Sequence, residues 1–266
     1  MSETPKILVL AGRRSATLDP MAEARGVSHK CVVPVGGVPM IERVLRIVDE
    51  AFPGAPVFVS IEDFNTIHDQ PTVAKLGLAG TITAVAAQHN IVDSVTQASR
   101  TSGFPLIITT ADNVLMTAES LHRLADDGRR SGADALVVVA EKQAIRAAHP
   151  DGQRRFYEFK DGGYSNCNMF WLGSPRALAA AEAFREGGQF AKQPKRIIKA
   201  FGLLNLIRFR MRRHSIGRMF EFISRRFKVD IRPQIVEDGR LAIDVDNERT
   251  HRVAEEILAR EGAPSK

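Results

Sequence analysis

The sequence is poor in cysteine and has no long hydrophobic run. Its two cysteines among 266 residues, Cys31 and Cys167, cannot form a disulfide framework or the thiolate cluster of a structural zinc site, so we expect both to pack in the core. No stretch of about 18 apolar residues occurs, and residues 1–6 lack the features of a secretion signal, so we expect neither a transmembrane helix nor a signal peptide. The spacing H-x-x-x-H of a metal site is also absent, and the histidines other than His29 are expected on the surface. We therefore expect a cytoplasmic protein, with peripheral attachment to the inner face of the membrane still allowed.

The excess of positive charge is confined to one segment. The chain holds 37 Lys and Arg residues against 31 Asp and Glu residues, a net charge of +6. Residues 192–228 contain 12 of the basic residues and one acid, Glu221, so this segment carries +11 and the rest of the chain −5. The uniformly basic surface of a nucleic-acid-binding protein is not expected, and no nucleic-acid-binding motif accompanies the charge.

Short apolar runs alternate with amphipathic segments along the chain. The apolar runs predict strands at residues 6–10, 56–61, 105–110, 133–140, 165–172 and 241–245. The amphipathic segments predict helices at residues 39–51, 93–100, 118–128 and 247–261. Strands and helices that alternate at this spacing indicate an α/β fold with a mainly parallel central sheet. Ligands of such sheets bind beyond the carboxyl ends of the strands, so the residues that follow each strand are the first candidates for a site.

A glycine and basic residues follow the first predicted strand. Gly12 lets the backbone approach a ligand closely, and Arg13 and Arg14 add positive charge, so this turn can hold phosphate oxygens. Lys30 precedes a short apolar stretch and a glycine pair, where its ammonium can act as a point charge on a phosphate. The competing interpretation is an ordinary turn with solvated arginines and a surface lysine.

Acidic residues occur at the ends of two other predicted strands. Asp112 comes directly after the third predicted strand, where a carboxylate can hold Mg²⁺. Asp244 and Asp246 alternate with apolar residues in the last predicted strand, so they point to one face and need a cation or water between them. Each acid is equally suited to cap a turn or a helix. Taken together with Gly12 and Lys30, the acids predict a site for a nucleoside triphosphate and Mg²⁺.

Six short segments occur in a characteristic order, at residues 8–12, 29–30 with 34–40, Gln88 with 93–95, 110–115, 166–170 and 243–246. This set resembles the nucleotidyltransferase superfamily with a glycosyltransferase-A-like fold, especially molybdenum-cofactor guanylyltransferase-like enzymes and adenosylcobinamide-phosphate guanylyltransferases. The resemblance implies a three-layer, Rossmann-related α/β sandwich with a basic helical insert. Residues 1–190 would form the nucleotide-binding and acceptor-pocket core, 191–230 the insert, and 231–266 a closing strand and helix.

The resemblance also implies a reaction and a set of site residues. The reaction is Mg²⁺-dependent transfer of a nucleoside monophosphate from an NTP, with GTP or CTP favoured, to a phosphorylated small-molecule or lipid-precursor acceptor, with release of pyrophosphate. The implied catalytic residues are Lys30, Arg13 and Asp112, and the implied metal ligands are Asp112, Asp246 and Asp244. The implied nucleotide-binding residues are Leu10, Ala11, Gly12, Arg14, Gln88 and Ser94. Asn166 and Asn168 would bind the acceptor.

The sequence departs from the family pattern at two places. The loop after Gly12 has no second glycine and no late arginine, and Asn113 and Val114 replace the usual proline-containing turn. The altered loop leaves room for a degenerate, non-catalytic nucleotide-binding module at the membrane. A glycosyltransferase with the same core is the other alternative, but it would carry a D-x-D motif after a central strand, where this chain has the single acid Asp112.

The basic segment carries an apolar stripe as well as its charge. Five residues recur on one helical face: Ile216, Met219, Phe220, Ile223 and Phe227. A basic amphipathic helix with aromatic residues fits an interfacial helix on an anionic membrane surface, bound through residues 192–228. The alternative is a pair of helices packed on the body, with the arginines solvated or lining an anionic acceptor pocket.

Overall fold

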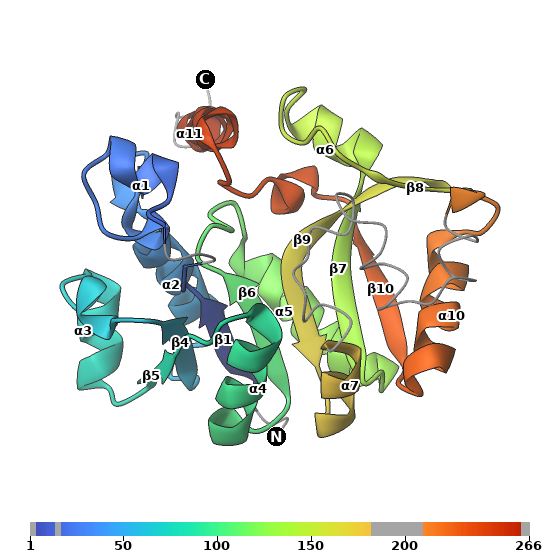
Figure 1. Ribbon diagram of the computed structural model, residues 1–266, viewed down its shortest axis with the longest axis horizontal. Coiled ribbons are helices and arrows are strands. Elements are labelled where there is room, and N and C mark those ends of the chain that lie inside the picture. The colour runs from blue at the N-terminus through green and yellow to red at the C-terminus, as the bar shows by residue number, and fades with distance from the viewer. Residues whose placement is uncertain (1–3, 14–16, 182–209, 262–266) are drawn as a thin grey trace.

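One sheet of eight strands organises the molecule. A computed structural model describes residues 4–13, 17–181 and 210–261. The strands lie in the order β10-β7-β9-β6-β1-β4-β5, and β8 pairs with β9 beside this path (Figure 1). Their bounds are β1 Lys6–Leu10, β4 Val57–Ile61, β5 Ile82–Ala86, β6 Leu106–Thr110, β7 Ala135–Glu141, β8 Tyr157–Phe159, β9 Gly162–Leu172 and β10 Ile231–Val236. A separate small hairpin consists of β2 Pro34–Val35 and β3 Val38–Pro39.

Most neighbouring strands run parallel. β1 is parallel to β4 and β6, β5 to β4, and β10 to β7, whereas β9 is antiparallel to β6, β7 and β8. β1, β4 and β6 are short apolar runs that are largely buried on both faces, as is usual for interior strands of a parallel sheet. The predicted α/β fold with a mainly parallel sheet is therefore confirmed.

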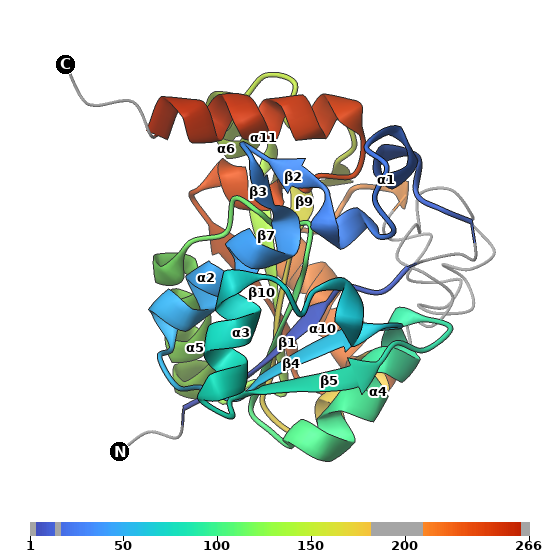
Figure 2. The ribbon, with the colours of Figure 1, turned by 90° about the vertical axis from the view of Figure 1, so that its left-hand side faces the viewer.

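Helices cover both faces of the sheet. Successive side chains of a strand point to opposite faces, so Ile7 and Val9 of β1 join one core cluster and Leu8 joins the other. The first cluster includes residues of α2 (Met40–Ala51), α3 (Pro71–Leu78), α5 (Ala118–Ser131) and α11 (Glu248–Glu261). The second includes residues of α4 (Ile91–Ser102), α7 (Leu178–Ala181) and α10 (Ile216–Phe227). Figure 2 shows these layers from the side. The other helices among the described residues are α1 (Pro20–Ala24) and α6 (Lys142–Ala148), with 3-10 turns at Lys30–Val32, Phe64–Thr66, Pro175–Ala177 and Gly239–Ala242.

The strand predicted at residues 241–245 is wrong. This stretch begins inside a 3-10 turn, Gly239–Ala242, and continues as irregular chain. The described sheet instead gains the strand Ile231–Val236, whose polar residues hid it in the sequence. The apolar residues of the stretch are nevertheless buried: Leu241, Ile243 and Val245. Gly239 lies directly on α6, where a Cβ atom would come 2.2 Å from the Ala144 carbonyl oxygen. The burial therefore arises from packing against α6, β7 and β9 and not from strand pairing.

Helix α10 turns its apolar stripe toward the sheet. Ile216 and Met219 are buried, and Phe220, Ile223 and Phe227 pack against the core. This favours the packed-helix interpretation for the described half of the basic segment; residues 192–209 lie outside the described residues. Across the ranges that the structure describes, no helix is long and apolar enough to cross a membrane. The division at residues 190 and 230 stays a prediction.

Candidate active site

The carboxyl ends of the parallel strands meet along one edge of the sheet. The backbone pairing continues past the strands, because the Ala11 N–H donates to the Ser60 carbonyl and the Ala111 N–H donates to the Leu10 carbonyl, both at 2.9 Å. The residues that follow β6, β1, β4 and β5 are therefore brought side by side: Asp112, Gly12, Glu62 and Gln88. This is the edge at which α/β sheets bind ligands.

Lys30 joins two carboxylates at this edge. Its Nζ atom lies 2.6 Å from Asp112 Oδ2 and 2.9 Å from Asp246 Oδ1. The Lys30 and Asp112 side chains are largely buried, whereas the Asp246 side chain is about half exposed. Burial lowers the pKa of Lys30, but the carboxylates of Asp112 and Asp246 outweigh burial and raise the pKa above its ordinary value. The lysine is therefore a permanent cation, and three of the predicted site residues form one cluster.

Backbone contacts explain how Asp246, far away in the sequence, reaches this cluster. The Asp112 carbonyl accepts a hydrogen bond from the Val245 N–H at 3.1 Å, which fixes the segment that carries Asp246. The Asp112 side chain is held in turn by the Thr110 hydroxyl, which donates to Oδ1 at 2.5 Å. The Asp112 backbone thus positions the Asp246 carboxylate, while Thr110 orients the carboxylate of Asp112 itself.

The two carboxylates suit a divalent cation. Both already converge on one positive charge, and carboxylate oxygens are the ligands that Mg²⁺ prefers. Asp244 is half-buried on the same segment, but within the described ranges no three His, Cys, Asp or Glu side chains are grouped to hold a metal ion. A magnesium ion at this position would take two protein ligands and complete its shell with water and phosphate oxygens.

The loop after β1 is packed closely against its neighbours. A Cβ atom on Gly12 would lie 2.7 Å from the Ala87 Cβ and 3.1 Å from Glu62 Oε1, so only glycine fits without a shift. The Arg13 N–H donates to Glu62 Oε1 at 2.7 Å, and the Arg13 residue is exposed. Leu10 and Ala11 lie in the sheet pairing that leads into the loop, and Arg14 lies outside the described residues. Glu62 was missed in the sequence, although it directly follows a predicted strand.

Ser94 and Gln88 shape the turn after β5. The buried Ser94 hydroxyl accepts a hydrogen bond from the Gln88 N–H at 2.9 Å, and the Gln88 side-chain amide donates to the Ala86 carbonyl at 3.0 Å. Ser94 therefore braces this loop, while the Gln88 residue is exposed at the edge of the sheet. Nucleotide contact by either residue stays a prediction.

The two predicted acceptor residues lie together at a bulge in β9. The pairing of β7 with β9 shifts register between Val137 and Val139, and Asn168 has a left-handed backbone with φ of 49°. Asn166 and Asn168 bind each other through the Asn166 side-chain amide and the Asn168 N–H, at 3.0 and 3.2 Å. Asn113, directly after Asp112, donates to the Cys167 carbonyl at 2.9 Å and so ties this bulge to the carboxylate cluster.

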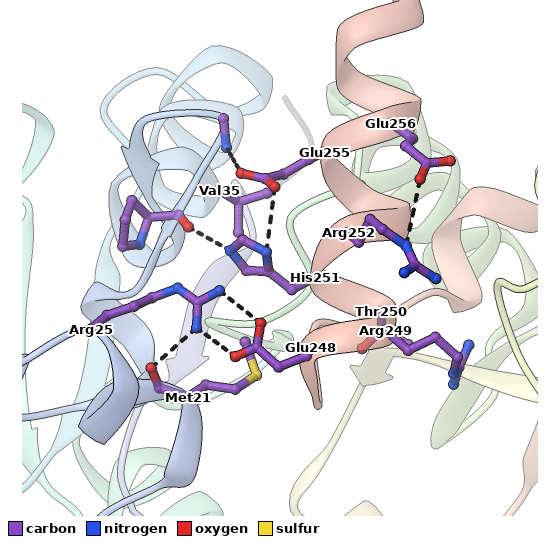
Figure 3. Close-up of polar contacts among 12 residues, drawn as sticks. Met21, Arg25, Val35, Glu248, Arg249, Thr250, His251, Arg252, Glu255 and Glu256 are labelled. Carbon is purple, nitrogen blue, oxygen red and sulfur yellow. Dashed lines mark hydrogen bonds and ion pairs between the residues drawn. The ribbon is translucent and has the colours of Figure 1, made fainter.

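Helix α11 fixes the chain segment that carries Lys30. His251 Nε2 lies 2.7 Å from the Pro34 carbonyl oxygen, and a Glu255 carboxylate oxygen accepts a hydrogen bond from the Gly36 N–H at 3.1 Å. Figure 3 shows these contacts beside the paired ions of Arg25 and Glu248, which meet at 2.6 and 2.9 Å. The expectation of a surface histidine is wrong for His251, whose imidazole is buried between α11 and the small hairpin, and for His149, which is also buried. Since α11 begins just after Asp246, it links the segment that carries Asp246 to the segment that carries Lys30.

Comparisons with known proteins bear on the family and the fold of the chain. The model of the MobA-like NTP transferase domain matches residues 7–201. A search of curated proteins found no match. Among solved structures, a hypothetical transferase from Thermus thermophilus has a TM-score of 0.74 and 21% identity, covering 94% of this chain and 100% of that one.

Two further solved structures share the fold at lower identity. The CMP:2-keto-3-deoxy-manno-octonic acid synthetase in complex with CTP has a TM-score of 0.61 at 13% identity, covering 97% of this chain and 100% of that one. The 4-diphosphocytidyl-2C-methyl-D-erythritol synthase from Anaerococcus prevotii has a TM-score of 0.60 at 11% identity, covering 97% of each chain. Because the family model spans well over half of the sequence, the chain belongs to the MobA-like NTP transferase family.

Proposed function

We propose that the protein transfers a nucleoside monophosphate from GTP or CTP to a phosphorylated acceptor and releases pyrophosphate. The observation that carries this proposal is the Lys30 ammonium bound between Asp112 and Asp246, beside the Gly12 loop. Membership of an NTP transferase family supports nucleotidyl transfer in general. The choice of nucleotide and of acceptor belongs to the proposal.

The proposed chemistry is an in-line displacement. An oxygen of the acceptor phosphate attacks the α-phosphorus of the NTP, and the bond between that phosphorus and the pyrophosphate oxygen breaks, its electron pair leaving with pyrophosphate. The protein's task is to position the reactants and to stabilise charge. Lys30 and Arg13 supply positive charge where negative charge builds up on the α-phosphate and the leaving group. Asp112 and Asp246 would hold Mg²⁺, which when bound neutralises further phosphate charge.

The acceptor is proposed to bind beside the bulge of β9. Asn166 and Asn168 each offer a side-chain amide there, and Asn113 keeps the bulge next to Asp112. A phosphorylated small molecule and a lipid precursor present the same phosphate chemistry to these amides. Attachment to a membrane through α10 would be electrostatic, because its apolar stripe packs on the core while Arg225 and Arg226 are exposed. Flotation with anionic liposomes at low and high salt tests that attachment.

The decisive experiment measures pyrophosphate release with each of the four NTPs, with Mg²⁺ and a panel of phosphorylated acceptors. We expect release with GTP or CTP only when a suitable acceptor is present. Asp112→Asn should lower the rate at least about a hundredfold, because the carboxylate charge is lost while the contact with Thr110 can remain. Asp126→Asn, on the exposed face of α5, is the matched control.

The same assay separates the alternatives. A glycosyltransferase would release a nucleoside diphosphate from a sugar nucleotide and no pyrophosphate from an NTP. A non-catalytic module would bind an NTP without releasing pyrophosphate across the panel. A rate in Asp112→Asn close to that of Asp126→Asn would contradict the role of the carboxylate cluster.

A further inference from the structure

Glu62 presents a carboxylate to the loop that follows β1. One of its oxygens accepts the Arg13 N–H at 2.7 Å, and the other lies 3.7 Å from His29 Nε2, beyond hydrogen-bond distance. The side chain is 37% exposed. Within the described ranges, the Arg13 amide supplies the one hydrogen bond to this carboxylate. Glu62 is thus held at one oxygen in a fixed position, while the side chain stays accessible to a ligand.

The strand order gives Glu62 its place relative to the phosphates. β6, which leads to Asp112, lies on one side of β1, and β4, which leads to Glu62, lies on the other. Adjacent strands are about 4.8 Å apart, so the lines of β6 and β4 are separated by about 10 Å. With the phosphates of an NTP at Lys30 and Asp112, as the proposed function requires, the nucleoside extends past Gly12 toward Glu62 and Gln88. This inference therefore rests on the proposed function.

The side chains on the nucleoside side offer acceptors. A carboxylate has no proton to donate at neutral pH. The Gln88 side-chain amide donates one N–H to the Ala86 carbonyl, so its oxygen can accept a hydrogen bond and its second N–H can donate one. Guanine, cytosine and adenine carry an exocyclic amino group that can donate to a carboxylate. Uracil and thymine carry a carbonyl oxygen where cytosine has its amino group, and a carboxylate would repel it.

We propose that Glu62 determines base specificity by accepting a hydrogen bond from the exocyclic amino group of the base. The site then selects amino-bearing nucleotides and rejects UTP and dTTP. The bond between Glu62 and the Arg13 amide fixes the carboxylate in advance, so little side-chain entropy is lost when the base binds. A site built to hydrogen-bond a substrate group rejects analogues that lack the group, because its own polar atoms are then left unpaired.

Isothermal titration of the full chain with GTP, CTP, ATP and UTP, each with Mg²⁺, tests the proposal. We expect the wild type to bind at least one amino-bearing nucleotide more tightly than UTP. In Glu62→Gln the amide oxygen can still accept the Arg13 N–H, but the amide nitrogen now faces the base. The preference for the amino-bearing nucleotide over UTP should fall by about tenfold to a hundredfold.

Asp63→Asn is the matched control, because it removes the same charge one residue away and an asparagine oxygen can still accept the Asn65 N–H. Its nucleotide preference should equal that of the wild type. The same preference in Glu62→Gln as in Asp63→Asn overturns the role of Glu62 and leaves the proposed function intact. A wild type that prefers UTP overturns the role of Glu62 and the choice of GTP or CTP, but not nucleotidyl transfer itself. A wild type that binds none of the four nucleotides overturns the proposed function and this inference with it.

Discussion

The Nζ atom of Lys30 lies 2.6 Å from Asp112 Oδ2, so the protein places its own cation on a carboxylate that is suited to a metal ion. Asp246 contacts the same ammonium from the other side at 2.9 Å. A divalent ion that arrives alone must compete with this lysine for both carboxylates. A triphosphate offers the ammonium new oxygen partners, so nucleotide and metal should bind cooperatively.

Replacing Lys30 by methionine tests this competition. Lys30→Met leaves two carboxylates without their internal cation, so we expect tighter Mn²⁺ binding in the absence of nucleotide, measured by electron paramagnetic resonance of free Mn²⁺. The rate of pyrophosphate release should fall by about a hundredfold to a thousandfold, because the variant lacks the ammonium that stabilises negative charge on the phosphates. Lys75→Met, which removes an exposed lysine paired with Asp49 on another face, is the control. Weaker Mn²⁺ binding in Lys30→Met than in this control would contradict the competition.

The close packing of the loop after β1 gives a second prediction. Gly12→Ala places a methyl group 2.7 Å from the Ala87 Cβ, so the loop must move and NTP affinity should fall by at least about tenfold. Gly217→Ala is a matched control in α10, where a Cβ atom meets nothing within 4 Å. That control should raise the free energy of unfolding by about 0.4–1 kcal/mol without changing NTP affinity, because alanine restricts the unfolded chain more than glycine does. Unchanged affinity in Gly12→Ala, measured by the same titration, would remove the loop from the binding site.

The elements with a strong apolar pattern could be predicted from the sequence. β1, β4 and β6 are continuous apolar runs, and their carboxyl ends directed attention to Gly12 and Asp112. The core positions of Cys31 and Cys167 are confirmed, since both thiols are buried. These strands could be predicted because burial on both faces of the sheet requires a run of consecutive apolar residues, which is visible in the sequence.

The elements that depend on distant contacts could not be predicted. β10 contains Arg232, Pro233 and Gln234, and it is a strand because β7 offers it a partner. His251 has an unremarkable sequence context, yet the Pro34 carbonyl, contributed from the other end of the chain, makes it a buried hydrogen-bonding residue. Glu62 follows a predicted strand, but its contacts with Gly12 and the Arg13 amide, which place its carboxylate at the loop, appear only in the structure.

The buried His29 predicts how stability changes with pH. Burial, and then the charge of Arg13, lower the pKa of His29 below its ordinary 6.5, against smaller opposing effects of Glu62 and Asp63. The unfolded chain therefore binds this proton more readily than the folded protein. The contribution to stability is present above pH 6.5 and is lost as the pH falls toward the lowered pKa of the folded state.

Replacing His29 by asparagine should remove this part of the acid sensitivity. Asparagine cannot bind the proton, but its amide can still hydrogen-bond the Ser28 hydroxyl that lies 2.9 Å from His29 Nδ1. Melting temperatures measured from about pH 7.5 to about pH 5 should therefore fall less steeply in His29→Asn than in the wild type. His68→Asn is the control, because that side chain is 58% exposed, whereas His29 is buried. If both variants follow the wild-type profile, folding does not lower the pKa of His29. The imidazole next to Lys30 in the sequence would then take up a proton at the same pH in the folded protein as in the unfolded chain.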